Sequence, residues 1–262
     1  MKQILLSFIF LSFISCIKQK KNDANIKTAS KTEITSENKA SKTEKTVLDT
    51  TKKIDLGYAD KYEKLPRLAV DTITETEFNQ LKSFASLEKV KTEKNGNFFY
   101  IQTEHTKHQF KKYKDYGGEE SWSGYDLLGY YTNLKLFAIT NSSTSESLGF
   151  GELFLLDDTN DYEYNIVSFG DRRVELPIPS VNNKYLVYYY NSAYESQNCD
   201  IGILKINDKK NPKTYLTETA TYHSDEFKIE KIIWKTDHVF YIKGYKEVDR
   251  QKLYSYHKLA IK

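Results

Sequence analysis

The stretch that decides the fold of this chain is YLVYYY, residues 185–190. Apolar and aromatic side chains occupy every position, so both faces of an extended strand would be apolar. Such residues favour extended backbone, and a strand that is apolar on both faces needs a covering layer on each side. The stretch therefore predicts a central strand with another layer on either face.

The sequence around this strand is also typical of β-structure. All 21 tyrosines follow residue 57, and apolar runs alternate with short groups of Gly, Asn, Asp and Ser. After residue 226, apolar and polar residues alternate with breaks at 235–237 and 246–250, which predicts an antiparallel meander. One amphipathic helix is expected at 75–87. Further strands are expected at 97–103, 125–139, 150–156, 163–169 and 201–206.

Residues 177–187 and 200–206 carry a turn-and-strand pattern. A serine and an Asn-Asn-Lys turn lead into the strand, and Asp200 begins the next apolar strand. The pattern resembles the blade signature of TolB-type and WD-like β-propeller proteins. This resemblance implies a propeller-like stack of antiparallel sheets, with about 40 to 45 residues per blade. A β-sandwich is the alternative, so the expected fold class is all-β in either arrangement.

The N-terminus has the pattern of a secretion signal. Lys2 precedes an apolar run at residues 4–17 that is too short to span a bilayer. Its end, FISC at residues 13–16, resembles the lipobox of bacterial lipoproteins. This resemblance implies a lipidated Cys16 that attaches the protein to a membrane. Because Ile17 follows in place of a retention residue such as Asp, it further implies the outer membrane, with the leaflet left open.

Composition divides the chain into three segments. Residues 1–15 are the expected signal peptide, residues 16–53 a lipidated cysteine and tether, and residues 54–262 a β-rich domain. From residue 18 to residue 53 there is no aromatic residue, Gly or Pro, and Lys outnumbers the acidic residues. A segment of this kind cannot bury enough apolar surface to fold. We expect a disordered tether with a reach of roughly 35 Å.

Charge and motifs exclude several classes of function. Residues 54–262 are slightly acidic, so nucleic acid is not an expected partner. No phosphate loop, dinucleotide fingerprint or Gly-x-Ser-x-Gly elbow occurs, and no cofactor is expected. His105 and His108 are three apart, whereas a zincin helix needs a spacing of four. Cys199 is expected to be a small buried or loop residue. The acidic run at 157–161 lacks the Gly and distal Glu of an EF-hand and predicts a hairpin turn.

The candidate ligand site is the glycine-rich segment YGGEESWSGY, residues 116–125. Its glycines permit an adaptable loop, and its carboxylates and aromatic rings supply acceptors and flat apolar faces. Sites for sugars and peptides use such groups. The alternative is that the tryptophan closes a sheet edge while the glutamates face solvent. The candidate ligand-binding residues are Tyr116, Glu119, Glu120, Trp122 and Tyr125.

No catalytic residue and no metal site are identified, and three functions remain. The first is a membrane-anchored binding or scaffold module of the envelope, whose partners are the membrane and either an envelope glycan or a protein. The second is an immunity or inhibitor protein that neutralises a toxin through a large exposed aromatic patch. The third is an envelope-glycan hydrolase. Adjacent Glu119 and Glu120 diverge in a strand, so a hydrolase would need a distant carboxylate such as Asp225 or Glu226.

Overall fold

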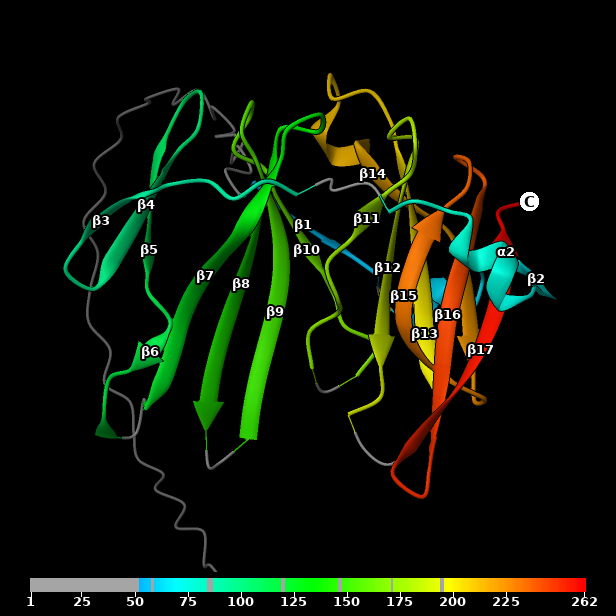
Figure 1. Ribbon diagram of the computed structural model, residues 1–262. Helices are drawn as coiled ribbons and strands as arrows, with labels where there is room; N and C mark the ends of the chain where they lie inside the picture. The colour runs from blue at the N-terminus through cyan, green and yellow to red at the C-terminus, as the bar shows by residue number, and fades with distance from the viewer. Residues whose placement is uncertain are drawn as a thin grey trace, which may run out of the picture. The chain divides into compact units, whose positions relative to one another are not determined.

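The computed structural model describes most of the chain from Lys52 onward (Figure 1). The expected signal peptide, Cys16 and nearly all of the tether lie outside the described residues, as do Glu119 and Glu120. The described residues are 52–57, 59–83, 87–118, 121–145, 148–170, 172–193 and 196–262.

The largest sheet, sheet A, has six strands in the order β1-β10-β9-β8-β7-β6. Its neighbouring strands are antiparallel except β1 and β10, which run parallel. The chain builds strands β2 to β9 between these two, as the long connection of a parallel pair requires. The strands are β1 (Lys53–Leu56), β6 (Lys114–Asp115), β7 (Trp122–Tyr131), β8 (Leu136–Ser145), β9 (Leu148–Asp157) and β10 (Glu163–Ile166).

Two four-stranded antiparallel sheets follow. Sheet B has the order β11-β12-β13-β14, and sheet C has the order β15-β16-β17-β2. Strand β2 pairs with the C-terminal strand β17, so sheet C joins segments from both ends of the folded unit. The strands are β11 (Ile178–Pro179), β12 (Tyr185–Asn191), β13 (Cys199–Ile206), β14 (Leu216–Ser224), β15 (Lys228–Trp234), β16 (Val239–Val248), β17 (Gln251–Ala260) and β2 (Ala69–Thr72).

The remaining elements are short. In the part of the chain that the structure describes, no helix has the length and apolar character needed to cross a membrane. The three strands of sheet D are β3 (Glu93–Asn95), β4 (Phe98–Gln102) and β5 (Lys107–Lys111). The helices are α1 (Ala59–Tyr62), α2 (Glu75–Asn79) and the 3₁₀ helix η2 (Pro212–Thr214).

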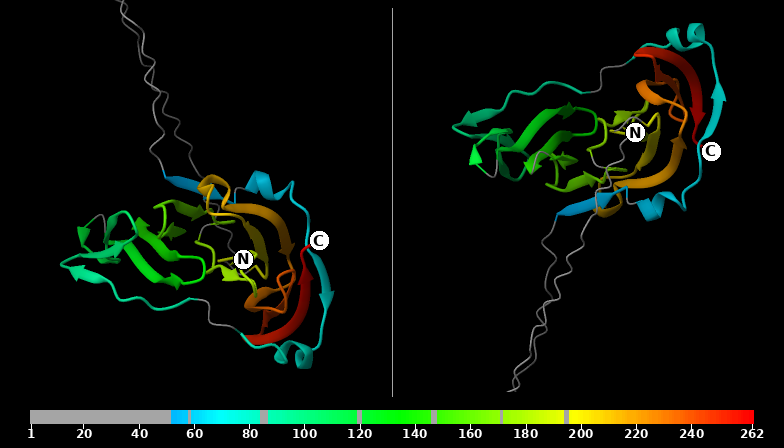
Figure 2. Two further views of the ribbon diagram at one scale, coloured as in Figure 1. Left: turned by 90° about the horizontal axis from the view of Figure 1, so that it is seen from above. Right: turned by 90° about the horizontal axis from the view of Figure 1, so that it is seen from below.

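The four sheets stack face to face in the order D, A, B, C (Figure 2). Phe110 of sheet D packs with Phe154 of sheet A in one buried cluster. Leu155, from the other face of strand β9, packs with Tyr188 of sheet B in a second cluster. Val187 of sheet B belongs to a third cluster, which continues into sheet C. Sheet B is therefore covered on both faces.

The central strand predicted at 185–190 is confirmed. It forms β12, which pairs with β11 on one side and β13 on the other. Leu186, Tyr188 and Tyr190 belong to the cluster between sheets A and B, whereas Val187 belongs to the cluster between sheets B and C. The strand is apolar on both faces because a neighbouring sheet covers each one.

The single strand predicted at 125–139 is wrong. This run forms two antiparallel strands, β7 and β8, joined by a turn at residues 132–135. Lys135 takes a positive φ of 50° in the turn. The turn contains Asn133 but neither Gly nor Pro, so its signal is weak between two strongly apolar flanks.

The helix predicted at 75–87 is shorter than expected and ends at Asn79. Thr74 caps it by accepting a hydrogen bond from the main-chain N–H of Glu77 at 3.1 Å. Phe78 is its buried residue and packs on sheet C. A short helix is stabilised mainly by tertiary packing of its apolar face. With one buried side chain, this helix has little such packing.

The all-β class and the antiparallel sheets are as predicted. None of the four sheets closes on itself, and their face-to-face stacking is compatible with a sandwich-type arrangement. The C-terminal meander is confirmed, although its second break is only two residues long. Asp249 and Arg250 have φ values of 50° and 63° there, as a tight two-residue hairpin requires.

Candidate functional site

Three strands of sheet A place a tyrosine, an amide and a carboxylate in one row. Tyr125 of β7 lies opposite Asn141 of β8, which lies opposite Glu152 of β9. Residues that lie directly opposite each other share one face of a sheet. Sheet D packs on this face through Phe110 but leaves Glu152 exposed. The row and the edge of sheet D border a cleft of about 260 Å³, which we call the Tyr125 cleft.

Three aromatic side chains line the Tyr125 cleft. The ring centre of Phe110 lies 5.3 Å from that of Tyr125 and 6.3 Å from that of Phe154. The rings of Tyr125 and Phe154 meet edge to face at 6.3 Å. Phe110 and Phe154 are buried, whereas Tyr125 is half-buried. Tyr125 therefore presents an aromatic ring to the cleft and is held by two core rings.

Strands β1 and β10 add charged and amide groups to the cleft. The Lys53 Nζ lies 3.0 Å from a carboxylate oxygen of Glu163, and the Asn165 amide donates to the Asp55 carboxylate at 2.9 Å. The hydrogen bond with Glu163 and the charge of Glu163 raise the pKa of Lys53, so its amine remains a cation. Both pairs join β1 to β10, so this part of the cleft depends on the pairing of β1.

Glu152 makes no close ion pair in the described part of the chain. The Asn141 amide donates to it at a long 3.4 Å, while Lys53 pairs with Glu163 instead. Three carboxylates and one ammonium line the cleft, which gives it a net negative charge. The amides of Asn141 and Asn165 add neutral donors and acceptors.

Tyr116 makes its contacts outside the Tyr125 cleft. Its hydroxyl donates to the Lys112 carbonyl oxygen at 2.6 Å. The ammonium groups of Lys111 and Lys114 lie 3.9 Å and 4.9 Å from its ring centre. The ring of Tyr116 is therefore occupied by cation–π contacts and does not line the Tyr125 cleft.

Trp122 begins strand β7 and is 46% exposed. Its ring centre lies 5.4 Å from that of Tyr113, and it does not line the Tyr125 cleft. Tyr125 is thus the member of the predicted set that lines this cleft. Glu119 and Glu120 lie outside the described residues.

The acidic run at 157–161 forms the turn between β9 and β10, as predicted. One carboxylate oxygen of Asp157 accepts hydrogen bonds from the main-chain N–H and the hydroxyl of Thr159, at 2.9 Å and 2.6 Å. The other lies 2.8 Å from the Lys209 ammonium. Asp157 is completely buried, and its partners are all groups of the chain itself.

Asp161 closes the same turn with a positive φ of 63°. Its carboxylate accepts from the hydroxyls of Thr103 and Thr106 at 2.5 Å and 3.0 Å, and lies 3.1 Å from His108 and 3.4 Å from Lys52. Burial raises the pKa of Asp161, but these hydrogen bonds outweigh it and hold the pKa well below its ordinary value. In the described part of the chain, no group of three His, Cys, Asp or Glu side chains could hold a metal ion.

The two histidines and the cysteine considered in the sequence show no arrangement for metal binding in the described part of the chain. His105 is exposed before β5, and His108 lies in β5 beside Asp161. Of the two expected surroundings of Cys199, buried or in a loop, the structure shows the first: it is fully buried in β13, and burial raises the pKa of its thiol well above the ordinary value. The thiol therefore stays protonated and is a poor nucleophile.

Asp225 and Glu226 do not line the Tyr125 cleft. Asp225 lies 3.1 Å from the Nε2 of His223, whose Nδ1 lies 2.7 Å from Asp200. Burial lowers the pKa of His223, but the two carboxylates outweigh this and raise it overall. The distant carboxylates considered for a hydrolase therefore lie away from the cleft.

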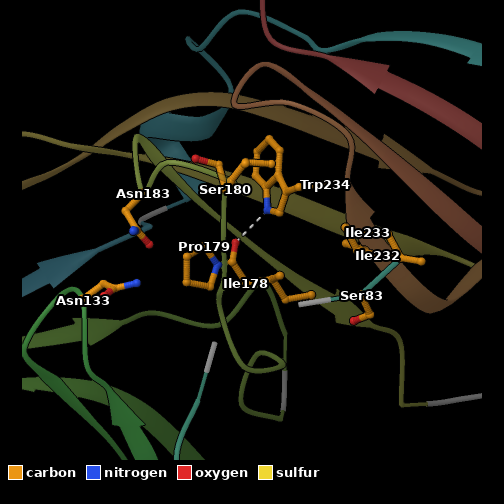
Figure 3. A pocket seen from close by; sticks show the side chains of 10 residues that line it. Ser83, Asn133, Ile178, Pro179, Ser180, Asn183, Ile232, Ile233 and Trp234 are labelled. Atoms are coloured by element: carbon orange, nitrogen blue, oxygen red, sulfur yellow. Dashed lines mark hydrogen bonds between the residues drawn. The ribbon is translucent and has the colours of Figure 1, made fainter. Parts of the chain in front are cut away.

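A second cavity, of about 310 Å³, lies between the turn that precedes β12 and strand β15 (Figure 3). We call it the Trp234 pocket. The indole Nε1–H of Trp234 donates to the Ile178 carbonyl oxygen at 2.9 Å across the two sheets. None of the residues that line this pocket is charged. Its chemistry therefore differs from that of the Tyr125 cleft.

Sequence reasoning found Tyr125 but missed the other groups of the cleft. Glu152 is the one charged residue in FGELFLL, residues 150–156. A single charge within an otherwise apolar strand is the sequence feature that could have pointed to it. Lys53 was assigned to the tether because β1 has only four residues and no long apolar pattern.

Comparison with known proteins found no matching family model, no similar curated protein and no similar solved structure.

Proposed function

We propose that this chain is a lipid-anchored binding module of the cell envelope that holds a saccharide in the Tyr125 cleft. The observation that carries the proposal is that an aromatic ring, carboxylates and amides meet in one cleft. The hydroxyls of a sugar pair with carboxylates and amides, and its C–H face packs on an aromatic ring. A volume of about 260 Å³ suits one or two sugar units more than a long chain.

The charge of the cleft selects among saccharides. Glu152 makes no close ion pair in the described chain, and Lys53, whose pKa the charge of Glu152 helps to raise, pairs with Glu163 instead. An acidic sugar would bring a carboxylate or phosphate toward this net negative surface, which opposes binding. We therefore expect neutral or amine-bearing saccharides to bind and acidic ones to be rejected.

The carboxylates of the cleft favour binding over hydrolysis. Glu163 is paired with Lys53, and Asp55 accepts from Asn165. Glycoside hydrolysis needs two carboxyl groups that act as acid and as base or nucleophile across one bond. In this cleft Glu152 is the carboxylate with the weakest protein contact, and a single such group is suited to accept hydrogen bonds from a ligand.

The binding test compares two conservative variants of the cleft. Glu152→Gln removes the charge and keeps the shape, and Tyr125→Phe removes the hydroxyl and keeps the packing. Glycan-array screening and calorimetry with neutral, amine-bearing and acidic envelope oligosaccharides should show binding that falls about tenfold or more in Glu152→Gln, as for a lost charged hydrogen bond. Glu175→Gln, an exposed glutamate outside the cleft, is the matched control. Equal binding in all four proteins would refute the site.

The anchor is part of the same proposal and has its own test. Its support is the resemblance of residues 13–16 to a lipobox, with the outer membrane as the expected location. The wild type should incorporate labelled palmitate and fractionate with outer membranes, whereas Cys16→Ser should do neither. A Cys16→Ser protein that still fractionates with membranes, without label in the wild type, would contradict the anchor.

We extend the proposal to a propeller-like arrangement of the sheets. Sheets B and C are successive four-stranded meanders that pack face to face, and β2 completes sheet C from the start of the domain. Blades of propellers have four strands, as sheets B and C do. An experimental structure that shows the sheets arranged around a central axis would support this extension.

A protein partner is the second candidate, with the toxin-neutralising function as its specific form. The observation that favours it is the end of the β8–β9 hairpin, where Leu148 is 62% exposed and Phe150 is 53% exposed. Contiguous exposed apolar surface marks protein contacts, and these two residues, two apart in β9, share one face of the strand. A defined partner that binds the wild type and not Phe150→Ser, with saccharide binding unchanged, would favour this function.

A further inference from the structure

The Trp234 pocket is walled by aliphatic groups from two sheets. Ile178 and Pro179 of β11 form one part of the wall, and Ile232 of β15 forms another. Trp234 is only 5% exposed, so little of its ring face is accessible from the pocket. Branched aliphatic side chains pack well against such a wall, whereas a sugar ring needs an open aromatic face.

Neutral polar groups stand at the rim of this pocket. In the described part of the chain, the side chains of Ser83, Asn133 and Asn183 make no hydrogen bond. Figure 3 shows the two asparagine amides on one side of Pro179 and Ser83 on the other. Each amide offers two donors and one acceptor, and the hydroxyl offers one donor. A peptide group, with one N–H and one C=O, matches these partners.

The pocket holds no charge that could balance an ionised ligand. Asp237, an acidic group bonded to the lining residue Ser180, also accepts twice from Asn182. An ammonium or carboxylate placed among Ile178, Pro179 and Trp234 would therefore lose its hydration without a counter-charge. The occupant has to be uncharged.

We propose that the Trp234 pocket is a second binding site, which takes an uncharged peptide group carrying a small aliphatic side chain. The aliphatic side chain lies on Ile178, Pro179 and Ile232, and the peptide N–H and C=O pair with Asn133 and Asn183. This site is separate from the Tyr125 cleft, because the two cavities share no lining residue.

The test uses Trp234 as the reporter. The chain has two tryptophans, so Trp122→Phe leaves Trp234 as the sole one. The probes are N-acetyl-leucinamide, free leucine and N-acetylglucosamine, titrated while tryptophan emission and the indole N–H signal of Trp234 are followed. N-acetyl-leucinamide should give a saturable change. Free leucine should bind at least about tenfold more weakly, because both of its ends are charged.

Rim variants identify the polar contacts. Asn133→Ala and Asn183→Asp should each weaken N-acetyl-leucinamide binding about fivefold or more, as for a lost hydrogen bond. Aspartate is chosen at Asn183 because this residue has a positive φ of 56°, which aspartate tolerates. Asn95→Ala is the matched control, since Asn95 is exposed and lies outside the pocket. If Asn183→Asp fails to fold, Asn133→Ala alone decides.

Three outcomes would overturn the assignment. The first is the absence of a saturable response to N-acetyl-leucinamide. The second is an equal response in wild type and in the folded rim variants. The third is tighter binding of N-acetylglucosamine than of N-acetyl-leucinamide, which would make a saccharide the occupant. Glu152→Gln should leave the response unchanged, so a failure of the Tyr125 cleft and a failure of this pocket are distinguishable.

Discussion

The Ser180 hydroxyl donates a hydrogen bond to the Asp237 carboxylate at 2.8 Å, and this bond joins sheet B to sheet C. Asp237 accepts two more from the main chain and the amide of Asn182, at 2.7 Å and 3.0 Å. The Ser180 oxygen in turn accepts from the main-chain N–H groups of Lys184 and Tyr185 at 3.0 Å and 3.1 Å. The turn that precedes β12 is therefore held by Asp237, from the turn between β15 and β16 of the neighbouring sheet.

Replacing Asp237 by Ala should destabilise the fold by about 2 kcal/mol, since it removes hydrogen bonds to a charged acceptor. Burial raises the pKa of Asp237, but the bonds from Asn182 and Ser180 outweigh it and lower the pKa overall. The stability from a group with a lowered pKa is complete above its unfolded pKa of about 4 and is lost as pH falls through the folded value.

Urea unfolding at pH 7 and pH 3 checks this. The difference between wild type and Asp237→Ala should be largest at pH 7 and smaller at pH 3. Asp60→Ala, at an exposed aspartate, is the control and should change stability little at either pH. A difference that grows on acidification would contradict the assigned role of the carboxylate.

Calcium should leave the melting temperature unchanged. The carboxylates of Asp157 and Asp161 are already paired with Thr159, Thr103 and the ammonium of Lys209, among other groups. A cation would have to displace these partners and face the lysine. Thermal melts with added CaCl₂ and with EDTA measure this directly. A shift of more than about 2 °C, which for a domain of this size is about 1 kcal/mol or less, would reinstate a calcium site.

Removal of residues 1–51 should leave a domain that unfolds cooperatively, whereas removal of residues 1–56 should not preserve its stability. The second truncation deletes β1, including Leu56, which is 3% exposed, and the ion pair of Lys53 with Glu163. Loss of one buried leucine side chain alone costs about 3 kcal/mol. Circular dichroism and urea unfolding of both proteins test this, and equal stability would show that β1 does not contribute.

Trp122→Ala should destabilise the domain by only about 1 kcal/mol. The side chain is 46% exposed and packs on Tyr113, so its loss leaves a smaller cavity than the 3 to 5 kcal/mol expected for a buried tryptophan. Saccharide binding at the Tyr125 cleft should be unaffected. Chemical unfolding and calorimetry on this variant decide both points. A loss above about 3 kcal/mol would assign Trp122 to the core after all.

The sequence by itself determined the strand content and the position of β12. These properties depend on local preference and on alternation along the strand, and residues 185–190 carry both signals strongly. The hairpin turn at 157–161 is equally local, because the side chain of Asp157 bonds within its own turn to Thr159. Where the local signal was weak, as at Asn133, the sequence-based boundary was wrong.

The binding surfaces were decided only by the tertiary structure. Asp55 and Asn165 are 110 residues apart and meet because β1 pairs in parallel with β10. The register of strands β7, β8 and β9 then determines which side chains share a face. A shift of one residue would turn Glu152 away from Tyr125 and Asn141. Pairing and register between distant strands depend on the packing of whole sheets, which no short stretch of sequence encodes.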